Sequence, residues 1–337
     1  MKISVLYLTD GGAELADRIT ASLENVRALN CRGNLTNTVQ RAWTESDAVI
    51  FIMAAGIVVR GIAPLLSDKH TDPAVVVCDE RGRFAVSLLS GHIGGANELA
   101  ERVASITGGK AVITTASDVL GHTALDLWAA ELGLVASERS AMTRAMGRLV
   151  NQGCIKIYSE VPLPKLPSDI RAVQSPESAD IIVSFSTAGK IAPYKACLLH
   201  PPVLSAGIGC NRGTSASQIS DALSETCLVN GLAIQSVSRI ATIDLKKDEE
   251  GLIEFAHSAG LPLLFFSKDQ LNRVEGCSFS HAAMKATGAR GVAEPAAILA
   301  SLNGKLIVRK MKWKDVTVAL ALDSSPWWEQ GLEPETS

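Results

Sequence analysis

The sequence predicts an α/β protein, with two α/β domains that contain mostly parallel sheets and a small middle α+β unit between them. Three observations predict this fold class: apolar strands alternate with amphipathic helices, the alternation occurs in both halves of the chain, and a proline-rich segment interrupts it. Continuous apolar strands separated by such helices are typical of a parallel sheet covered on both faces. At 337 residues, the chain also exceeds the length that one hydrophobic core usually serves.

The N-terminal α/β domain is predicted over residues 1–136, where strands and helices alternate most regularly. The predicted strands are Ile3–Leu8, Ala48–Met53, Ala74–Cys78, Phe84–Leu89 and Ala111–Thr114. The predicted helices are Ala13–Leu23, Leu99–Ile106 and Leu125–Leu132. Ligands of such sheets bind at the carboxyl ends of the strands, so the loops that follow the strands are the first candidates for a site.

The middle unit is predicted over residues 137–202, where the alternation loosens. Three prolines between residues 161 and 167 indicate an extended turn or linker, because proline fits neither a helix interior nor a central strand. A helix over Ser140–Gln152 and a strand over Cys154–Tyr158 precede this turn. A unit of this size is too small to be stable alone.

The C-terminal α/β domain is predicted over residues 203–323, where the regular alternation returns. The predicted strands are Val203–Ile208, Ser238–Ile243, Pro262–Phe266, Leu306–Lys310 and Val316–Leu320. The predicted helices are Ser215–Leu223, Glu249–Ala259 and Ala296–Leu302. The last residues, 324–337, are expected to form a tail that is either mobile or docked on a neighbour.

Composition and charge exclude several classes of protein. A net charge of −3 gives no electrostatic reason to expect nucleic acid as a partner. No apolar run reaches the roughly 18 residues that a helix needs to span a bilayer. The seven cysteines are scattered without any Cys-x-x-Cys spacing, which is typical of a reducing compartment. We therefore expect a cytoplasmic protein that binds neither nucleic acid nor a membrane.

The densest run of glycine and polar residues lies between the strand that ends at Leu89 and the helix that begins at Leu99. The run consists of Ser90, Gly91, His92, Ile93, Gly94, Gly95, Ala96, Asn97 and Glu98. Glycines at a strand-to-helix turn let the backbone approach a ligand closely, and the helix points unpaired N–H groups at that ligand. The run therefore predicts an anion-binding site.

This run is one of several longer sequence words that occur in a fixed order along the chain. The words are Ala54–Arg60, Lys69–Pro73, Val75–Val77 with Asp79, Ser90–Asn97, Ser205–Thr214, Ala241–Lys246 and Gly291–Ala297. In these words the chain resembles the cobalt-precorrin-5A hydrolases, the CbiG family of anaerobic cobalamin biosynthesis, over nearly its whole length. The C-terminal domain also resembles the stand-alone CobE proteins of the aerobic pathway.

The resemblance implies a hydrolase of cobalamin (vitamin B12) biosynthesis. Its substrate would be cobalt-precorrin-5A, a ring-contracted cobalt tetrapyrrole that carries acetate and propionate carboxylates. Opening of its lactone with loss of acetaldehyde would give cobalt-precorrin-5B. The substrate brings the cobalt, so neither a cofactor nor a protein-bound metal is expected. The implied protein partner is the ring-contracting methyltransferase, in a transient contact.

His92 is the first candidate for a catalytic base or acid, because imidazole gains and loses a proton near neutral pH. It could instead cap the helix, hydrogen-bond the backbone or contact the cobalt of the substrate. Asp79 is the second candidate, as a carboxylate that orients His92 or activates water. Its neighbours, Arg81 to Arg83, equally indicate a hairpin turn with solvated charges.

Residues expected to bind the substrate come from both glycine-rich regions. Arg60, Lys69 and Arg212 are assigned to peripheral carboxylates, because Arg in particular holds a carboxylate with two parallel hydrogen bonds. Asn97 and Asn211 either donate to a substrate carbonyl or cap turns. The small residues expected to shape the binding loops are Gly56, Ser90, Gly91, Gly94, Gly95 and Gly209.

Two other functions explain part of these features. A tetrapyrrole carrier would need only the binding loops, and the full set of N-terminal words with His92 favours an enzyme over it. A nucleotide or sugar-phosphate enzyme would need G-x-x-x-x-G-K-[ST] or G-x-G-x-x-G, and neither occurs. Gly207, Gly209 and Gly213 miss the second motif, because three residues rather than two lie between Gly209 and Gly213. Cys210 has no base near it in sequence, which argues against thiol catalysis.

Overall fold

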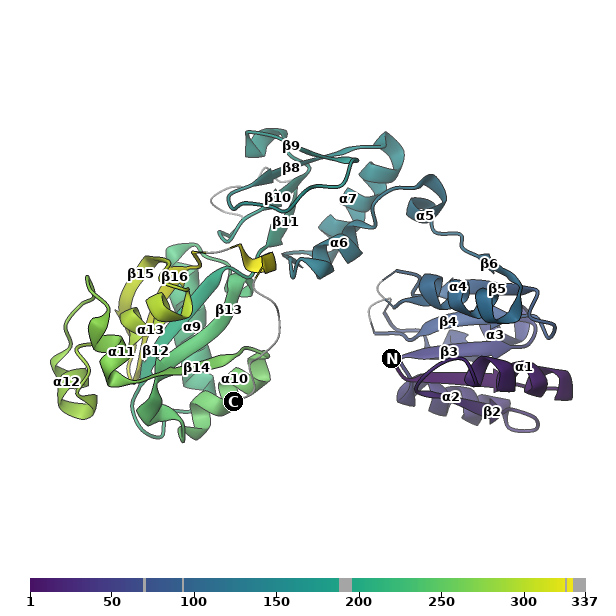
Figure 1. Ribbon diagram of the computed structural model, residues 1–337, viewed down its shortest axis with the longest axis horizontal. Coiled ribbons are helices and arrows are strands. Elements are labelled where there is room, and N and C mark those ends of the chain that lie inside the picture. Colours follow the sequence, from purple (N-terminus) through teal and green to yellow (C-terminus); the bar gives the residue numbers. More distant parts are fainter. Residues whose placement is uncertain (69–70, 93, 188–195, 325, 330–337) are drawn as a thin grey trace. The chain divides into compact units, whose positions relative to one another are not determined.

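The computed structural model describes residues 1–337 except 69–70, 93, 188–195, 325 and 330–337 (Figure 1). Its described strands form three sheets in succession along the chain, one of six strands and two of five. The chain divides into two compact units, Met1–Leu127 and Trp128–Ser337. Most strand pairs in the sheets are parallel and helices pack against them, which confirms the predicted α/β class.

The first unit contains a six-stranded sheet in the order β2-β1-β3-β4-β5-β6. Its strands are β1 (Ile3–Tyr7), β2 (Val26–Asn30), β3 (Ala48–Ile52), β4 (Ala74–Cys78), β5 (Phe84–Leu89) and β6 (Lys110–Val112). Its helices are α1 (Asp10–Thr20), α2 (Leu35–Glu45), α3 (Ala55–Ile62), α4 (Ala96–Thr107) and α5 (Ala116–Leu120), with the short helix η1 (Ala63–Leu65).

The direction of the strands changes within this sheet. Strands β1 to β4 are parallel, β5 returns antiparallel to β4, and β6 is parallel to β5. The carboxyl ends of β5 and β6 therefore point to the same edge of the sheet as the amino ends of β1, β3 and β4. This reversal decides which loops can share a site.

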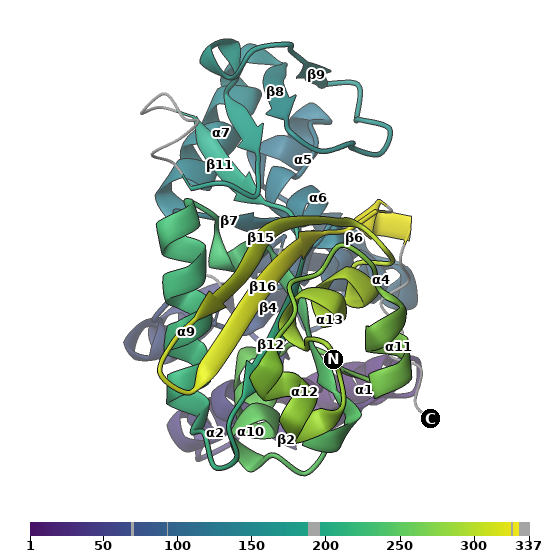
Figure 2. The ribbon, with the colours of Figure 1, turned by 90° about the vertical axis from the view of Figure 1, so that its left-hand side faces the viewer.

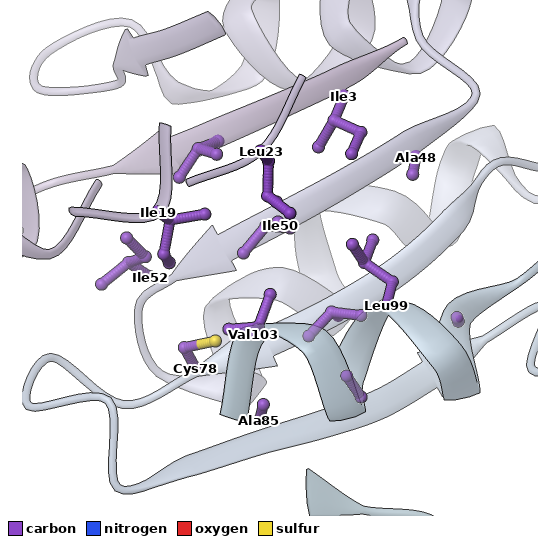
Figure 3. Packing of buried hydrophobic residues seen from close by; sticks show 14 of the residues in the cluster. Ile3, Ile19, Leu23, Ala48, Ile50, Ile52, Cys78, Ala85, Leu99 and Val103 are labelled. Carbon is purple, nitrogen blue, oxygen red and sulfur yellow. The ribbon is translucent and has the colours of Figure 1, made fainter. Parts of the chain in front are cut away.

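Helices cover both faces of this sheet, as the continuous apolar strands predicted. Ile50 and Ile52 of β3 pack with residues of α1 and α4, and Figure 3 shows them beside Ile19 and Leu99. Phe51, between them in sequence, packs on the opposite face with residues of α2 and α3. Burial of each such side chain contributes about 1.5–3 kcal/mol of stability.

The sequence analysis missed β2 and α2. Strand β2 is the outermost strand of the sheet, and none of its side chains is fully buried. Arg27 and Asn30 interrupt its apolar pattern. Because alternation is the main signal for a strand, a partly exposed edge strand with polar residues escapes it.

The second unit begins with a five-stranded sheet in the order β7-β11-β10-β8-β9. Its strands are β7 (Val135–Ala136), β8 (Ile155–Ser159), β9 (Ile170–Ala172), β10 (Ile181–Val183) and β11 (Cys197–His200). Its helices are α6 (Leu125–Glu131) and α7 (Arg139–Gln152), with the short helix η2 (Pro176–Ser178). The proline-rich segment lies between β8 and β9 outside any helix or strand, as predicted.

Two features of this middle region add to the prediction. Its sheet is mostly parallel, with only β7 antiparallel to its neighbour among the described residues. Strand β7 pairs with β11, although the prediction assigned residues 135 and 136 to the N-terminal domain. Strands of two or three residues are too short to show the alternation that would have revealed them.

The last sheet has the order β14-β13-β12-β16-β15, and Figure 2 shows its β15–β16 hairpin in yellow. Its strands are β12 (Leu204–Cys210), β13 (Val237–Ile243), β14 (Leu263–Phe266), β15 (Lys305–Lys312) and β16 (Val316–Leu322). The helices are α9 (Ala216–Asn230), α10 (Glu250–Ala259), α11 (Lys268–Arg273), α12 (His281–Thr287), α13 (Ala293–Ala300), η3 (Ile234–Ser236), η4 (Asp244–Lys246) and η5 (Trp327–Glu329). In the tail, the Trp327 indole N–H donates to the carbonyl oxygen of Leu132 at 2.6 Å, so this part of the tail is docked.

Helix α13 lies so close to β12 that residue 207 must be glycine. A Cβ atom on Gly207 would overlap the carbonyl oxygen of Ala293. The side chains around this contact are equally small, because Ala293 and Ala297 pack against Ala319 and Ala321 of β16. Gly207, which belongs to the sequence word Ser205–Thr214, is therefore needed for the packing of α13 against β12.

We expect Gly207→Ala to lower the free energy of unfolding of the second unit by about 1–3 kcal/mol, because the helix must move away. Gly147→Ala in α7 is the control, since a Cβ atom there meets nothing within 4 Å. It should raise stability by about 0.5–1 kcal/mol. Urea unfolding of both variants measures the difference, and equal midpoints would contradict the close packing.

Candidate functional site

The glycine-rich loop that joins β5 to α4 is shaped by its own close packing. Ser90 has a φ of 56° and Gly95 a φ of 82°, both in the left-handed region that favours glycine. A Cβ atom on Gly94 would overlap Ser90, and one on Gly91 would lie 2.7 Å from Oδ1 of Asn97. These glycines are therefore required by the loop itself, whether or not a ligand approaches it.

The first turn of α4 is less open to an anion than the sequence suggested. The N–H group of Ala96 donates to the carbonyl oxygen of Ser90 at 3.2 Å, and that of Asn97 donates to the carbonyl oxygen of Gly91 at 3.0 Å. The prediction assumed that such groups at a helix start are unpaired. The loop folds back on the helix, and its carbonyl oxygens accept hydrogen bonds from two of these N–H groups. An anion bound here would therefore have to be recognised mostly by side chains.

Asn97 connects three segments of the first unit through its carboxamide. Its Oδ1 accepts a hydrogen bond from Oγ of Ser87 on β5 at 2.6 Å. Its Nδ2 donates to Oδ2 of Asp118 at 2.8 Å and to Oγ1 of Thr115 at 3.2 Å. The residue is 9 % exposed, so these contacts satisfy a nearly buried amide. It neither caps the turn nor stands free to donate to a substrate.

His92 lies against the same segment after β6. Its Nε2 is 2.9 Å from Oγ of Ser117 and 3.6 Å from Oδ2 of Asp118. The His92 side chain is 10 % exposed, so the ring is enclosed but reaches the surface. We call His92, Asn97, Ser117 and Asp118 the His92 cluster. It combines a titratable ring, a hydroxyl and an oriented carboxylate at one edge of the sheet.

The sequence analysis missed Ser117 and Asp118 as site residues. They follow β6 and form part of α5, with β6 running parallel to β5. Loops after two parallel neighbouring strands meet at the same edge of a sheet, so this segment had to lie beside the glycine-rich loop. The strand-end rule, applied to β6 as well as to β5, would have found them.

The expectation that Asp79 orients His92 is wrong. Asp79 follows the carboxyl end of β4, and β5 then runs back along β4, with Cys78 beside Ala85 and Val75 beside Leu89. The loop that contains His92 is therefore one strand length away, about 17 Å for five residues. Asp118 occupies the place that the prediction gave to Asp79.

Asp79 instead holds the hairpin turn, as the alternative interpretation suggested. Its carboxylate accepts hydrogen bonds from the backbone N–H groups of Phe84 at 2.8 Å and Arg81 at 3.1 Å, and from Nε of Arg83 at 3.4 Å. Partial burial raises the pKa of Asp79, but these three donors outweigh it, so the pKa lies below its usual value. This carboxylate stays ionised to support the turn.

Gly56 and Arg60 lie at the Asp79 edge rather than beside His92, because α3 begins after the carboxyl end of β3. Arg60 falls in the last turn of α3 and not at its start, and both residues are exposed. A cavity of about 500 Å³ at this edge is lined mainly by apolar residues from the ends of β1, β3 and β4, from the start of α3 and from β5 and β6, together with Thr9, Asp79 and Glu80. Lys69 lies outside the described residues.

In the C-terminal sheet, Asn211 and Arg212 are engaged by neighbouring loops. Nδ2 of Asn211 donates to Oδ1 of Asp315 at 2.9 Å. Nη1 of Arg212 lies 2.7 Å from Oδ1 of Asp248, and its Nη2 donates to the carbonyl oxygen of Leu245. A Cβ atom on Gly209 would lie 2.6 Å from Oγ1 of Thr317, so this glycine serves strand packing. The assignment of these residues to the substrate stays a prediction.

Glu249 is the buried anchor of this loop. Its carboxylate accepts hydrogen bonds from the N–H group of Gly213 at 2.7 Å and from Nζ of Lys246 at 2.9 Å, and Arg212 lies 3.8 Å away. The side chain is 4 % exposed. Burial raises the pKa of Glu249, but Lys246, Gly213 and Arg212 together hold it below its usual value. The carboxylate therefore stabilises the folded loop in its ionised form.

We expect Glu249→Gln to lower the free energy of unfolding at pH 7 by about 1–3 kcal/mol, because charged hydrogen bonds are lost. A pKa that is lower in the folded than in the unfolded protein stabilises the fold above the ordinary value of 4.5, and this stabilisation is lost as the pH falls below it. The difference in the free energy of unfolding between wild type and variant, measured by urea unfolding, should therefore narrow as the pH falls below 4.5. Glu254→Gln on α10 is the control, and a difference independent of pH would contradict the account.

Three further observations concern the helices, the possible metal ligands and the cysteines of the described part of the chain. None of its helices is both long and apolar enough to cross a membrane. Among the residues that the structure describes, no group of three or more His, Cys, Asp or Glu residues could hold a metal ion. All seven cysteines are free, and burial raises the pKa of Cys210, which makes it a poor nucleophile.

The fold and the site define the class as an α/β protein of three successive sheets whose first sheet carries a histidine-centred polar cluster. Family models match all three parts: Cobalamin synthesis G N-terminal over residues 37–118, Cobalamin biosynthesis central region over 123–189 and Cobalamin synthesis G C-terminus over 204–321. The chain belongs to the CbiG family of cobalamin biosynthesis proteins. The matched N-terminal region includes every member of the His92 cluster.

Curated relatives agree with this family over most of the chain. The cobalt-precorrin-5A hydrolase of Priestia megaterium is 39 % identical over 307 residues, which cover 86 % of this chain and 82 % of that protein. The cobalt-precorrin-5A hydrolase of Salmonella typhimurium is 34 % identical over 345 residues, covering 95 % of this chain and 97 % of that protein. Protein CobE of a Sinorhizobium species is 31 % identical over 119 residues, covering 34 % of this chain and 77 % of CobE. The predicted family resemblance is confirmed.

Proposed function

We infer that this chain is a cobalt-precorrin-5A hydrolase of cobalamin biosynthesis. It opens the lactone of the ring-contracted cobalt tetrapyrrole, with loss of acetaldehyde, to give cobalt-precorrin-5B. The observation that carries this conclusion is the agreement with two curated hydrolases of this substrate, at 39 % and 34 % identity, over nearly the whole chain.

Lactone opening places specific demands on the protein. Water must lose a proton as it attacks the carbonyl carbon, and the departing alkoxide oxygen must gain one. Within the described part of the first unit, His92 is the titratable ring that combines partial exposure, a place in a glycine-rich loop and hydrogen-bonded support. We assign it the proton transfer, and this role is supported by geometry alone.

The environment of the reaction is part of the proposal. The cobalt belongs to the substrate, and hydrolysis needs no electron carrier, so we propose that no resident cofactor takes part. The seven free cysteines support a reducing, cytoplasmic setting. A transient contact with the ring-contracting methyltransferase would pass the substrate on without exposing it to the solvent.

We expect His92→Ala to lower kcat by about 10²- to 10⁴-fold, the range that general acid–base catalysis contributes. The measurement is anaerobic incubation with cobalt-precorrin-5A, with trapping of acetaldehyde and mass analysis of the tetrapyrrole. His257→Ala, on the exposed face of α10, is the control and should keep the wild-type rate.

Two results would contradict the proposal at different points. Wild-type turnover by His92→Ala would remove His92 from the mechanism but leave the hydrolase function standing. Tight binding of the substrate by the wild type without acetaldehyde or any mass change would contradict the hydrolase and favour a tetrapyrrole carrier.

A further inference from the structure

Two side-chain oxygen atoms face the same nitrogen of His92. Oγ of Ser117 lies 2.9 Å from Nε2, and Oδ2 of Asp118 lies 3.6 Å from it. Among the residues that the structure describes, none hydrogen-bonds to the other ring nitrogen, Nδ1. The two nitrogens of the ring are therefore in different surroundings, and the inference that follows rests on the proposed function.

The orientation of the Asp118 carboxylate is set by Asn97. Oγ of Ser87 donates to Oδ1 of Asn97, which turns the NH₂ group of that amide toward Asp118. Nδ2 of Asn97 then donates to Oδ2 of Asp118 at 2.8 Å, and this is the same oxygen that faces His92. A carboxylate oxygen offers only lone pairs, so the carboxylate disfavours a lone pair on Nε2.

A neutral imidazole carries its proton on only one nitrogen, and its hydrogen bonds decide which one. With the proton on Nε2, the ring donates to Oγ of Ser117 and the proton also lies near the Asp118 carboxylate. With the proton on Nδ1, a lone pair on Nε2 would face that carboxylate. We propose that Asp118, held by Asn97, keeps the proton on Nε2 and leaves Nδ1 as the base that acts on water.

The lactone-opening step, taken before the release of acetaldehyde, balances with this assignment. The oxygen of water bonds to the lactone carbonyl carbon while one proton of the water passes to Nδ1 of His92. The ester C–O bond then breaks, and the same proton passes from Nδ1 to the departing alkoxide oxygen. The products are a carboxyl group and an alcohol, and His92 returns to its starting state. Asp118 is a positioning residue, since it acts through His92.

The same geometry argues against a serine nucleophile. In a serine–histidine–aspartate triad the serine and the aspartate occupy opposite ring nitrogens. Here Ser117 and Asp118 both face Nε2, so the proton that Asp118 favours on Nε2 removes the lone pair that would activate Ser117. Ser117 is also 7 % exposed, which leaves little room for a substrate carbonyl.

The test determines directly which ring nitrogen of His92 carries the proton in the substrate-free protein. Nitrogen-15 labelled histidine gives separate Nδ1 and Nε2 signals in long-range proton–nitrogen NMR, recorded at mildly alkaline pH. The chain has six histidines, and the signals of His92 are identified by their loss in His92→Gln. We expect the wild type to carry the proton on Nε2, and a proton on Nδ1 would overturn the proposal.

Asp118→Asn is the variant that should move the proton. Its amide oxygen can still accept the hydrogen bond from Asn97, but the negative charge that favours a proton on Nε2 is gone. The ring should respond by moving its proton to Nδ1, with a loss in kcat of about 10²- to 10⁴-fold at a similar KM. Asp17→Asn, on the exposed face of α1, is the control.

The outcomes separate this inference from the proposed function. A proton that stays on Nε2 in Asp118→Asn would overturn the role of Asp118, even in an active enzyme. The wild-type spectrum tests the assignment on its own if the variant does not fold, because it needs no substrate. A wild type that releases no acetaldehyde would contradict the proposed function whatever the spectrum shows.

Discussion

The carboxamide of Asn97 is the interaction on which the N-terminal site depends. It sits in the first turn of α4 and reaches β5 through Ser87 and the segment after β6 through Thr115 and Asp118. Both of its ends are used, and it is nearly buried, so loss of one partner would leave an unsatisfied group at a cost of about 1–3 kcal/mol. The glycine-rich loop and α5 are therefore fixed to one another before any substrate arrives.

The direction of β5 then divides the polar residues of the first sheet into two groups. The loops after β5 and β6 bring the His92 cluster together at one edge, while Asp79 and Arg60 belong to the opposite edge. Each group has its own physical role. The first combines a titratable ring with an oriented carboxylate, and the second combines a hairpin turn with a largely apolar cavity. We propose that the hydrolytic chemistry takes place at the first group.

The sequence predicted the parts that depend on local pattern and left out those that depend on strand direction. Strand β4 has the predicted bounds, because its five residues are all apolar and fully buried. The pairing of Asp79 with His92 failed because the glycine at position 82, with a φ of 66°, turns the chain back and reverses β5. Asp118 lies 26 residues from His92 in sequence, beyond a helix and a strand, so no local spacing indicates that the two side chains meet. Only the order and direction of strands in the sheet could place it.

The central claim is that the protein directs water to the lactone carbonyl, and one measurement tests it most directly. A single turnover of cobalt-precorrin-5A by the wild-type protein would be run anaerobically in water enriched in oxygen-18, and the product tetrapyrrole would be analysed by mass. The account predicts one heavy oxygen in a carboxyl group of the tetrapyrrole, formed together with acetaldehyde. A product without heavy oxygen, or the same incorporation without protein, would contradict it.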